Sequence, residues 1–193
     1  MSWAWLDVRP ILVAIAGPNG AGKTTFYRAH LLSAGLRFVN ADQIAGELGL
    51  DAYAAAEVAS ALRTSLVEQS ESFVFETVFS DPAREKIEFL KLAKSKGYTV
   101  SLCFIGLDSS RVSEQRVAMR VSQGGHDVPS DKLKLRYPRT LINLQAAIAE
   151  LPHVLVFDNS NLATPFQLIA VFENGFPVHQ ARRKPAWFNK IVS

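Results

Sequence analysis

The chain has 193 residues, of which 48% are hydrophobic and 20% are charged, and it carries a net charge of +3 at pH 7. These values are typical of a soluble globular protein, and the length suggests one domain, residues 1–193, with a sizeable core. The mild positive charge suits an anionic ligand but argues against nucleic acid as a partner, and a single cysteine excludes an internal disulfide or a cysteine-based metal site.

The sequence also bears on where the protein acts. No apolar run approaches the length of a membrane span, and the N-terminus lacks the basic start and long apolar core of a signal peptide. We therefore expect no contact with a membrane and a cytoplasmic location.

A glycine-rich segment follows the first apolar run, residues 11–16, and leads into a predicted helix. Strand, glycine-rich turn, Lys-Thr and helix in this order are typical of a P-loop. Glycines let backbone N–H groups converge on phosphate oxygens, and the helix dipole favours the same anion. We expect Lys23 to reach the phosphates of ATP and Thr24 to ligate Mg²⁺. The expected nucleotide-binding residues are Gly17, Pro18, Asn19, Gly20, Ala21, Gly22, Lys23, Thr24 and Thr25.

Predicted strands and helices alternate through the rest of the chain. The apolar runs predict strands at residues 36–40, 72–75, 98–105 and 154–157. Helical spacing and capping signals predict helices at residues 51–69, 81–96, 109–121 and 130–150. Asp81-Pro82 is expected to begin the second of these helices as N-cap and first helical position.

This alternation predicts an α/β fold, a three-layer α/β/α P-loop domain with a mostly parallel five-stranded sheet. Near the end, Asn174-Gly175 between two short apolar runs predicts a C-terminal β-hairpin at about residues 166–180. Trp187-Phe188 follows the hairpin and is either buried against the core or a docking surface for a partner.

Polar residues follow several of the predicted strands, and ligands of such sheets bind beyond the carboxyl ends of the strands. Asp42 could be a general base that takes a proton from a substrate hydroxyl, or the N-cap of a following helix. Glu76 could face a substrate or be a solvated loop carboxylate, and Asp42 and Glu76 could instead both serve Mg²⁺ through water. Asp158 is expected to shape a loop.

Arginines gather after the fourth predicted strand. Arg116 and Arg120 are four residues apart on one helix, and Arg136 and Arg139 are three apart, with a Gly-Gly loop between the two pairs. This layout suggests a lid at about residues 109–140 that closes on a transferring phosphoryl group, although a solvated basic face would look similar. His126 in the loop is more typical of a turn than of a catalyst.

Taken together, these motifs resemble the zeta-toxin family of P-loop kinases. The resemblance rests on residues 17–25 (GPNGAGKTT), 39–44 (VNADQI), 75–80 (FETVFS), 116–129 (RVAMRVSQGGHDVP), 136–144 (RYPRTLINL) and 157–160 (FDNS). It implies an ATP- and Mg²⁺-dependent small-molecule kinase that phosphorylates the 3′-hydroxyl of a UDP-N-acetyl amino sugar, with an antitoxin as a possible partner protein.

The resemblance also implies roles for individual residues. Lys23 and Thr24 would hold phosphates and Mg²⁺, and Asp42 would be the base. Glu76 and Thr77 would bind the substrate sugar. In the lid, Arg120 with Arg116 or Arg136 would supply charge to the transition state, and Arg136 and Arg139 would face the substrate.

Two alternative functions stay open on the sequence. One is a nucleotide-binding regulatory or toxin–antitoxin module with little catalysis, and the other is a nucleoside or polynucleotide kinase.

Overall fold

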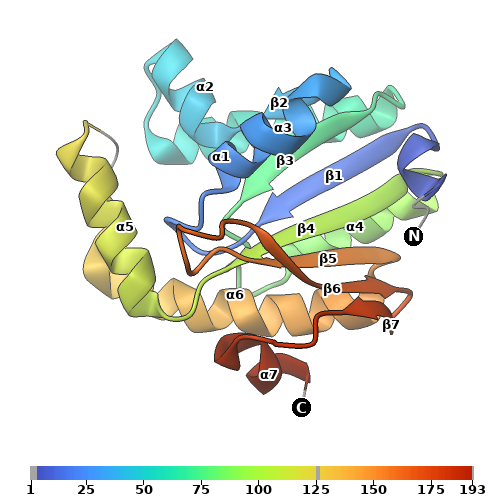
Figure 1. Ribbon diagram of the computed structural model, residues 1–193. Coiled ribbons are helices and arrows are strands. Elements are labelled where there is room, and N and C mark those ends of the chain that lie inside the picture. Colours follow the sequence, from blue (N-terminus) through green and yellow to red (C-terminus); the bar gives the residue numbers. More distant parts are fainter. Residues whose placement is uncertain (1–3, 125–126, 193) are drawn as a thin grey trace.

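The computed structural model describes residues 4–124 and 127–192, and within these ranges it contains a seven-stranded sheet with helices on both faces (Figure 1). The strand order is β2-β3-β1-β4-β5-β6-β7, and the first five of these strands run parallel. The strands are β1 Ile11–Ala16, β2 Arg37–Val39, β3 Phe73–Thr77, β4 Thr99–Gly106, β5 His153–Asp158, β6 Gln167–Glu173 and β7 Phe176–Gln180.

The described helices connect these strands, and none of them is long and apolar enough to cross a membrane. The α-helices are α1 Lys23–Phe26, α2 Ala41–Leu48, α3 Ala52–Glu68, α4 Glu85–Ser95, α5 Ser110–Ser122, α6 Ser130–Glu150 and α7 Ala186–Val192. Shorter turns are η1 Ala4–Asp7, η2 Tyr27–Leu31 and η3 Leu32–Ala34.

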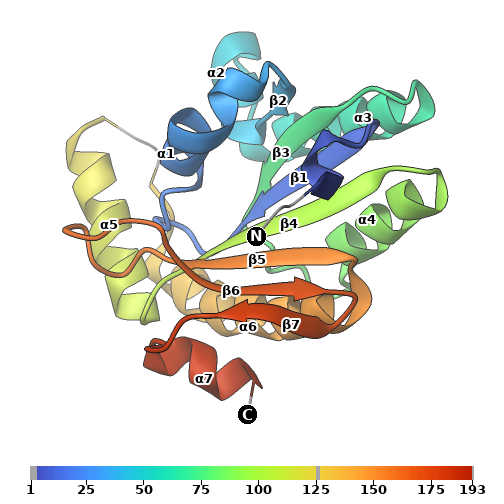
Figure 2. The same cartoon turned by 45° about the vertical axis from the view of Figure 1, so that its right-hand side comes forward.

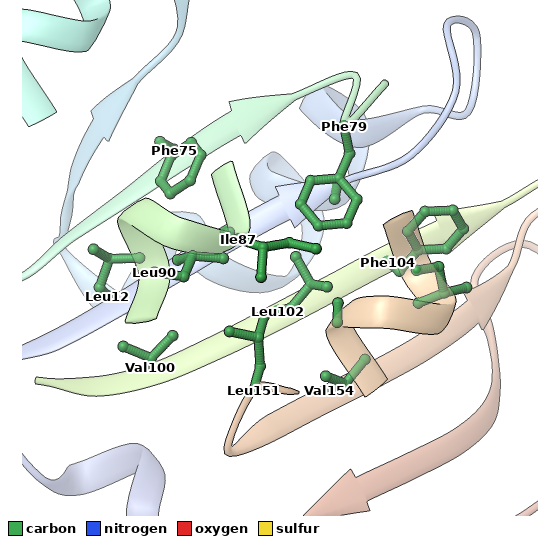
Figure 3. Close-up of a cluster of buried hydrophobic side chains, with 14 of the residues drawn as sticks. Leu12, Phe75, Phe79, Ile87, Leu90, Val100, Leu102, Phe104, Leu151 and Val154 are labelled. Atoms are coloured by element: carbon green, nitrogen blue, oxygen red, sulfur yellow. The ribbon is translucent and has the colours of Figure 1, made fainter. Parts of the chain in front are cut away.

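Alternate residues of β1 enter two separate cores, because successive side chains of a strand point to opposite faces. Leu12 and Ala14 belong to the larger core, which α3, α4, α6 and α7 cover and which Figure 3 shows in part. Ile11, Val13 and Ile15 belong to the smaller core, which α1 and η2 cover. Both faces of the strand are buried, which explains its uninterrupted apolar sequence and confirms the three-layer prediction.

The sheet differs from the prediction in strand number. The predicted hairpin is present, but its strands β6 and β7 join the sheet and bring the total to seven. Strand β6 pairs antiparallel with β5, from His153 opposite Glu173 to Asp158 opposite Gln167. This pairing satisfies the backbone groups that would otherwise stand unpaired along the edge of β5.

The segment before α4 also differs from the prediction. The helix begins at Glu85, and Arg84, which precedes it, has a left-handed backbone with φ 56°. The side-chain amide of Asn143 donates to the carbonyl oxygens of Phe79 and Asp81, at 3.0 and 2.9 Å. Because α6 holds residues 79–81 in this way, Asp81 does not act as the N-cap.

The C-terminal helix α7, which was not predicted, packs on α6 at the base of the domain (Figure 2). Its Trp187 and Phe188 are 2% and 0% exposed, so the idea that they form a docking surface is wrong. The Trp187 ring lies directly over Gly106 at the end of β4, where an added Cβ would fall 2.1 Å from the ring.

This contact predicts opposite effects for two glycine substitutions. Gly106→Ala forces the buried Trp187 ring to move and should lower the free energy of unfolding by about 1–3 kcal/mol. In the control, Gly46→Ala on α2, the new methyl group meets nothing within 4 Å, and helix propensity should raise stability by about 0.5–1 kcal/mol. Urea unfolding of both variants tests the contact, and equal stability of Gly106→Ala and wild type would contradict it.

Candidate functional site

The glycine-rich segment forms a tight loop between β1 and α1. Gly17 has φ 145°, and a Cβ there would lie 2.2 Å from the carbonyl oxygen of Ile105. Gly22 has φ 87° and forms the N-cap of α1. Only glycine fits these positions without strain, and the result is a loop whose backbone can approach an anion closely.

Residues from distant segments hold the loop in place. The side-chain amide of Asn159, which is buried after β5, donates to the carbonyl oxygen of Ala21 at 2.8 Å. The hydroxyl of Ser113 on α5 donates to the carbonyl oxygen of Asn19 at 2.6 Å. Asn159 is one of the polar residues that follow a predicted strand, at residues 154–157, whereas Ser113 was missed because nothing local marks a helix serine as a loop contact.

The carboxylate of Glu76, at the end of β3, is the polar centre of the site. Its Oε2 accepts hydrogen bonds from the Thr24 hydroxyl at 2.7 Å and from the Asn40 side-chain amide at 3.0 Å. Its Oε1 lies 3.8 Å from the ammonium group of Lys23. Glu76 is therefore no solvated loop carboxylate, because it joins the P-loop to the start of α2.

Lys23 is 6% exposed, and its ammonium group also donates to the carbonyl oxygen of Pro18 at 3.1 Å. Burial lowers the pKa of Lys23, the charges of Glu76 and Asp42 raise it, and the charge of Arg120 lowers it. Asp42 and Arg120 therefore both lie within electrostatic reach of the P-loop lysine. A bound polyanion would offset the cost of burying this cation.

Asp42 lies in the first turn of α2 but does not cap it. The Asn40 side-chain oxygen accepts from the backbone N–H groups of Asp42 and Gln43, at 2.8 and 3.2 Å, and so forms the cap. The N-cap interpretation of Asp42 is therefore wrong. Its carboxylate instead lines a cavity beside the P-loop.

This cavity has a volume of about 540 Å³ and lies between α2, α3 and the segment after β3. It brings together five of the predicted site residues, which are Lys23, Asp42, Glu76, Thr77 and Arg136. Residues from the P-loop, the ends of two strands and α6 thus share one space, which we call the acceptor cavity.

Arg63 on α3 also lines the acceptor cavity, although it is only 7% exposed. Its guanidinium carbon lies 5.1 Å from the centre of the Phe75 ring and 5.8 Å from that of Phe89. Arg63 was not among the predicted site residues. The sequence did indicate that Arg63 is buried, because it follows Ala55 and Ala59 at four-residue spacing and so lies in phase with the apolar face of its helix.

A second cavity, of about 310 Å³, lies on the other side of the P-loop and is lined by Gly20, Gly22, Thr25 and the Phe166 ring, among others. Arg116 lines this cavity and not the first. Its guanidinium donates to the carbonyl oxygens of Asn159 and Ser160, at 2.6 and 3.1 Å. Arg120, the other predicted lid arginine on α5, lines neither cavity but lies within electrostatic reach of Lys23.

The remaining predicted residues are distributed as follows. Arg139 lines neither cavity. Asp158 accepts from the Trp187 indole at 2.9 Å and from the Ser160 hydroxyl at 2.5 Å, so it shapes the loop after β5 as expected. His126 lies outside the described residues.

The contact between Asn159 and Ala21 yields a prediction. Asn159→Ala leaves the buried carbonyl of Ala21 without its donor, and we expect a loss of about 1–3 kcal/mol in stability together with weaker nucleotide binding. Asn161→Ala is the control, because Asn161 is exposed and its side-chain oxygen accepts from the backbone N–H of Ala163 within its own turn. Thermal unfolding and nucleotide titration measure both effects, and equal behaviour of the two variants would argue against the role of Asn159.

Several known proteins are similar to this chain. An uncharacterized protein of Haemophilus influenzae is 29% identical over 126 residues, which are 63% of this chain and 88% of that protein. A solved AvrRxo1-ORF1:AvrRxo1-ORF2 complex matches with a TM-score of 0.71 at 19% identity, over 97% of this chain and 65% of that chain. This chain therefore spans less than two thirds of the length of the AvrRxo1 chain.

A second solved structure, of the PezAT chromosomal toxin–antitoxin system of Streptococcus pneumoniae, matches with a TM-score of 0.58 at 16% identity. The match covers 93% of this chain and 76% of the PezAT chain. At identities this low, the structural likeness shows a shared fold only. The family is shown by sequence, because the zeta toxin family model matches residues 50–167, which is more than half of the chain. This protein is therefore a member of the zeta-toxin family.

Proposed function

We propose that this protein transfers the γ-phosphoryl group of ATP to a hydroxyl group of a small molecule bound in the acceptor cavity. The observation that carries the proposal is that one cavity contains both the P-loop lysine, Lys23, and a carboxylate, Asp42, that is free of a capping role. A phosphoryl donor and a general base thereby meet across one space.

The donor half of the site suits ATP. The P-loop offers its backbone to the phosphates, and the second cavity lies next to it with an aromatic ring, Phe166, in its wall. One of the similar solved structures is an AvrRxo1 complex with ATP. Because its substrate is ATP, we expect the protein to act in the cytoplasm.

The oxygen atoms beside the P-loop suit Mg²⁺. The Thr24 hydroxyl and the Glu76 carboxylate are 2.7 Å apart, and Mg²⁺ prefers oxygen ligands completed by water and substrate phosphates. Thr24 and Glu76 would hold the ion, directly or through water. The ion would neutralise charge on the phosphates during transfer.

The chain's own residues supply the rest of the reaction. The Asp42 carboxylate accepts the proton of the acceptor hydroxyl while the hydroxyl oxygen attacks the γ-phosphorus. The bond from phosphorus to the leaving oxygen breaks, and ADP carries away the bonding electrons. Lys23 and Arg120 stabilise the charge on the phosphoryl oxygens.

For the acceptor, we favour the 3′-hydroxyl of a UDP-N-acetyl amino sugar, as family membership suggests. A cavity of about 540 Å³ is in the range of small-molecule sites, and Glu76, Thr77 and Arg136 offer polar groups to a sugar. An antitoxin that covers the site is the corresponding protein partner, since PezAT is described as a toxin–antitoxin system. Phosphate transfer from labelled ATP to UDP-N-acetylglucosamine tests the acceptor directly.

Asp42→Asn should lower kcat about 10²- to 10⁴-fold without weakening ATP binding, because the amide keeps the shape but cannot accept the proton. The matched control is Asp51→Asn. Asp51 is the exposed N-cap of α3 and lies outside the cavity, and asparagine keeps the cap, so the rate should stay unchanged. Steady-state kinetics with both substrates separate the two. Equal kcat for Asp42→Asn and wild type would exclude Asp42 as the base.

The lid arginines give a second prediction. We propose that Arg116 positions the nucleotide and that Arg120 acts on the transferred group. Arg116→Met should raise the KM for ATP about tenfold with a small change in kcat, because it loosens the wall of the second cavity. Arg120→Met should lower kcat about 10³-fold or more. The two residues are one helical turn apart, so the two variants serve as controls for each other. The same kinetic change in both would contradict the proposed division of roles between Arg116 and Arg120.

A further inference from the structure

The second cavity, on the nucleotide side of the P-loop, has a mainly apolar wall. Four of its lining residues carry no nitrogen or oxygen in their side chains, and these are Met119, Leu162, Pro165 and Phe166. The cavity also adjoins Gly20 and Gly22 of the P-loop. A nucleotide whose phosphates lie on the P-loop would therefore place its base against apolar groups.

Phe166 is held in this wall by its backbone and by two other rings. Its φ of 54° is left-handed, which is rare for a bulky residue and persists only where the surrounding structure enforces it. Its ring meets that of Phe26 at 5.4 Å and 72°, and that of His30 at 5.7 Å and 90°. These nearly perpendicular contacts fix the plane of the Phe166 ring beside the cavity.

The polar side chains of the same wall are already engaged. Among the lining residues that the structure describes, only Thr25, Arg116 and Asn159 carry a side-chain nitrogen or oxygen. The Asn159 amide donates to the carbonyl oxygen of Ala21, and its oxygen accepts from the backbone N–H of Phe166 at 3.4 Å. Arg116 is tied at Nη2 to two backbone carbonyls, and a guanidinium stacks on the face of any base. Thr25 follows the P-loop directly in α1, where the phosphates are expected.

The backbone of residues 163–166 cannot read a base edge either. The N–H of Ala163 donates to the side-chain oxygen of Asn161 at 2.9 Å, and that of Thr164 donates to the Asn161 carbonyl at 3.3 Å. The next residue is a proline without an N–H, and the N–H of the last is the one that Asn159 binds. Adenine N1 and guanine O6 are both acceptors, so reading either purine there requires a free N–H.

We propose that Phe166 is a stacking surface for the base of the donor nucleotide and that the site does not discriminate between purines, so that GTP serves as phosphoryl donor as well as ATP. This inference rests on the proposed kinase function and defines its donor range. Stacking tolerates different bases because every base has a π face. With GTP the reaction is the same: the acceptor oxygen bonds to the γ-phosphorus, its proton passes to Asp42, and GDP leaves with the electrons of the broken bond.

The first experiment measures nucleotide binding without turnover. Wild-type protein with Mg²⁺ is titrated calorimetrically with the β,γ-imido analogues of ATP and GTP, and with inorganic tripolyphosphate as a probe that has no base. We expect the two analogues to bind within about tenfold of each other and both to bind at least about tenfold more tightly than tripolyphosphate. A site that read the base edge would reject the wrong purine by a far larger factor. A preference above about tenfold for either purine, or no gain from the base, would overturn the proposal.

The second experiment assigns the base contact to Phe166. Phe166→Leu removes the ring but keeps an apolar side chain, and it should weaken both analogues about tenfold, by the same factor, while leaving tripolyphosphate binding unchanged. Phe166→Tyr keeps the ring and should bind both analogues as wild type does. Phe176→Leu is the control, because Phe176 is 75% exposed on β7 and lines neither cavity. Unchanged affinity for both analogues in folded Phe166→Leu would refute the assignment, and the wild-type titration stands even if that variant fails to fold.

Transfer assays with both nucleotides separate this inference from the proposed function. Equal binding of the two analogues without phosphate transfer from ATP or GTP to any acceptor would reject the kinase proposal and support the tolerant base site. Transfer from ATP combined with a KM for GTP more than about tenfold higher would support the kinase proposal and reject the tolerant site.

Discussion

The site depends on one carboxylate, that of Glu76. It binds the Thr24 hydroxyl, the Asn40 amide and the Lys23 ammonium group, and so connects the P-loop, the start of α2 and the end of β3. The connection is possible because β3 pairs directly with β1, with Glu76 opposite Ile15. Charge-assisted hydrogen bonds of this kind are stronger than neutral ones, and here they fix the two halves of the site relative to each other.

A second set of contacts runs from the C-terminal helix to the opposite side of the P-loop. The Trp187 indole binds Asp158, and the next residue, Asn159, binds Ala21. Arg116 joins the same loop by donating to the carbonyl of Asn159. Through the contact between Trp187 and Asp158, the C-terminal region supports the side of the P-loop on which the second cavity lies.

Two buried cations, Lys23 and Arg63, lie on the wall of the same cavity. Each loses hydration on folding, and for each the pKa is lowered by burial. Lys23 recovers part of the cost from Glu76, whereas the Arg63 guanidinium lies over the rings of Phe75 and Phe89.

Three features were predictable from the sequence because each depends on a local pattern. Glycine geometry predicted the P-loop, apolar periodicity predicted the alternation of strands and helices, and the ends of parallel strands predicted the rim position of Asp42. The tertiary structure alone decided which neighbours these residues acquired. Glu76 reached the P-loop through the strand order, and the N-cap of α2 went to Asn40 and left Asp42 to the cavity. Arg63 lines the cavity because α3 packs its apolar face beside it, and antiparallel pairing of β6 with β5 placed the hairpin in the sheet. A local pattern can indicate that a residue such as Arg63 is buried, but it does not record which distant segment the residue meets.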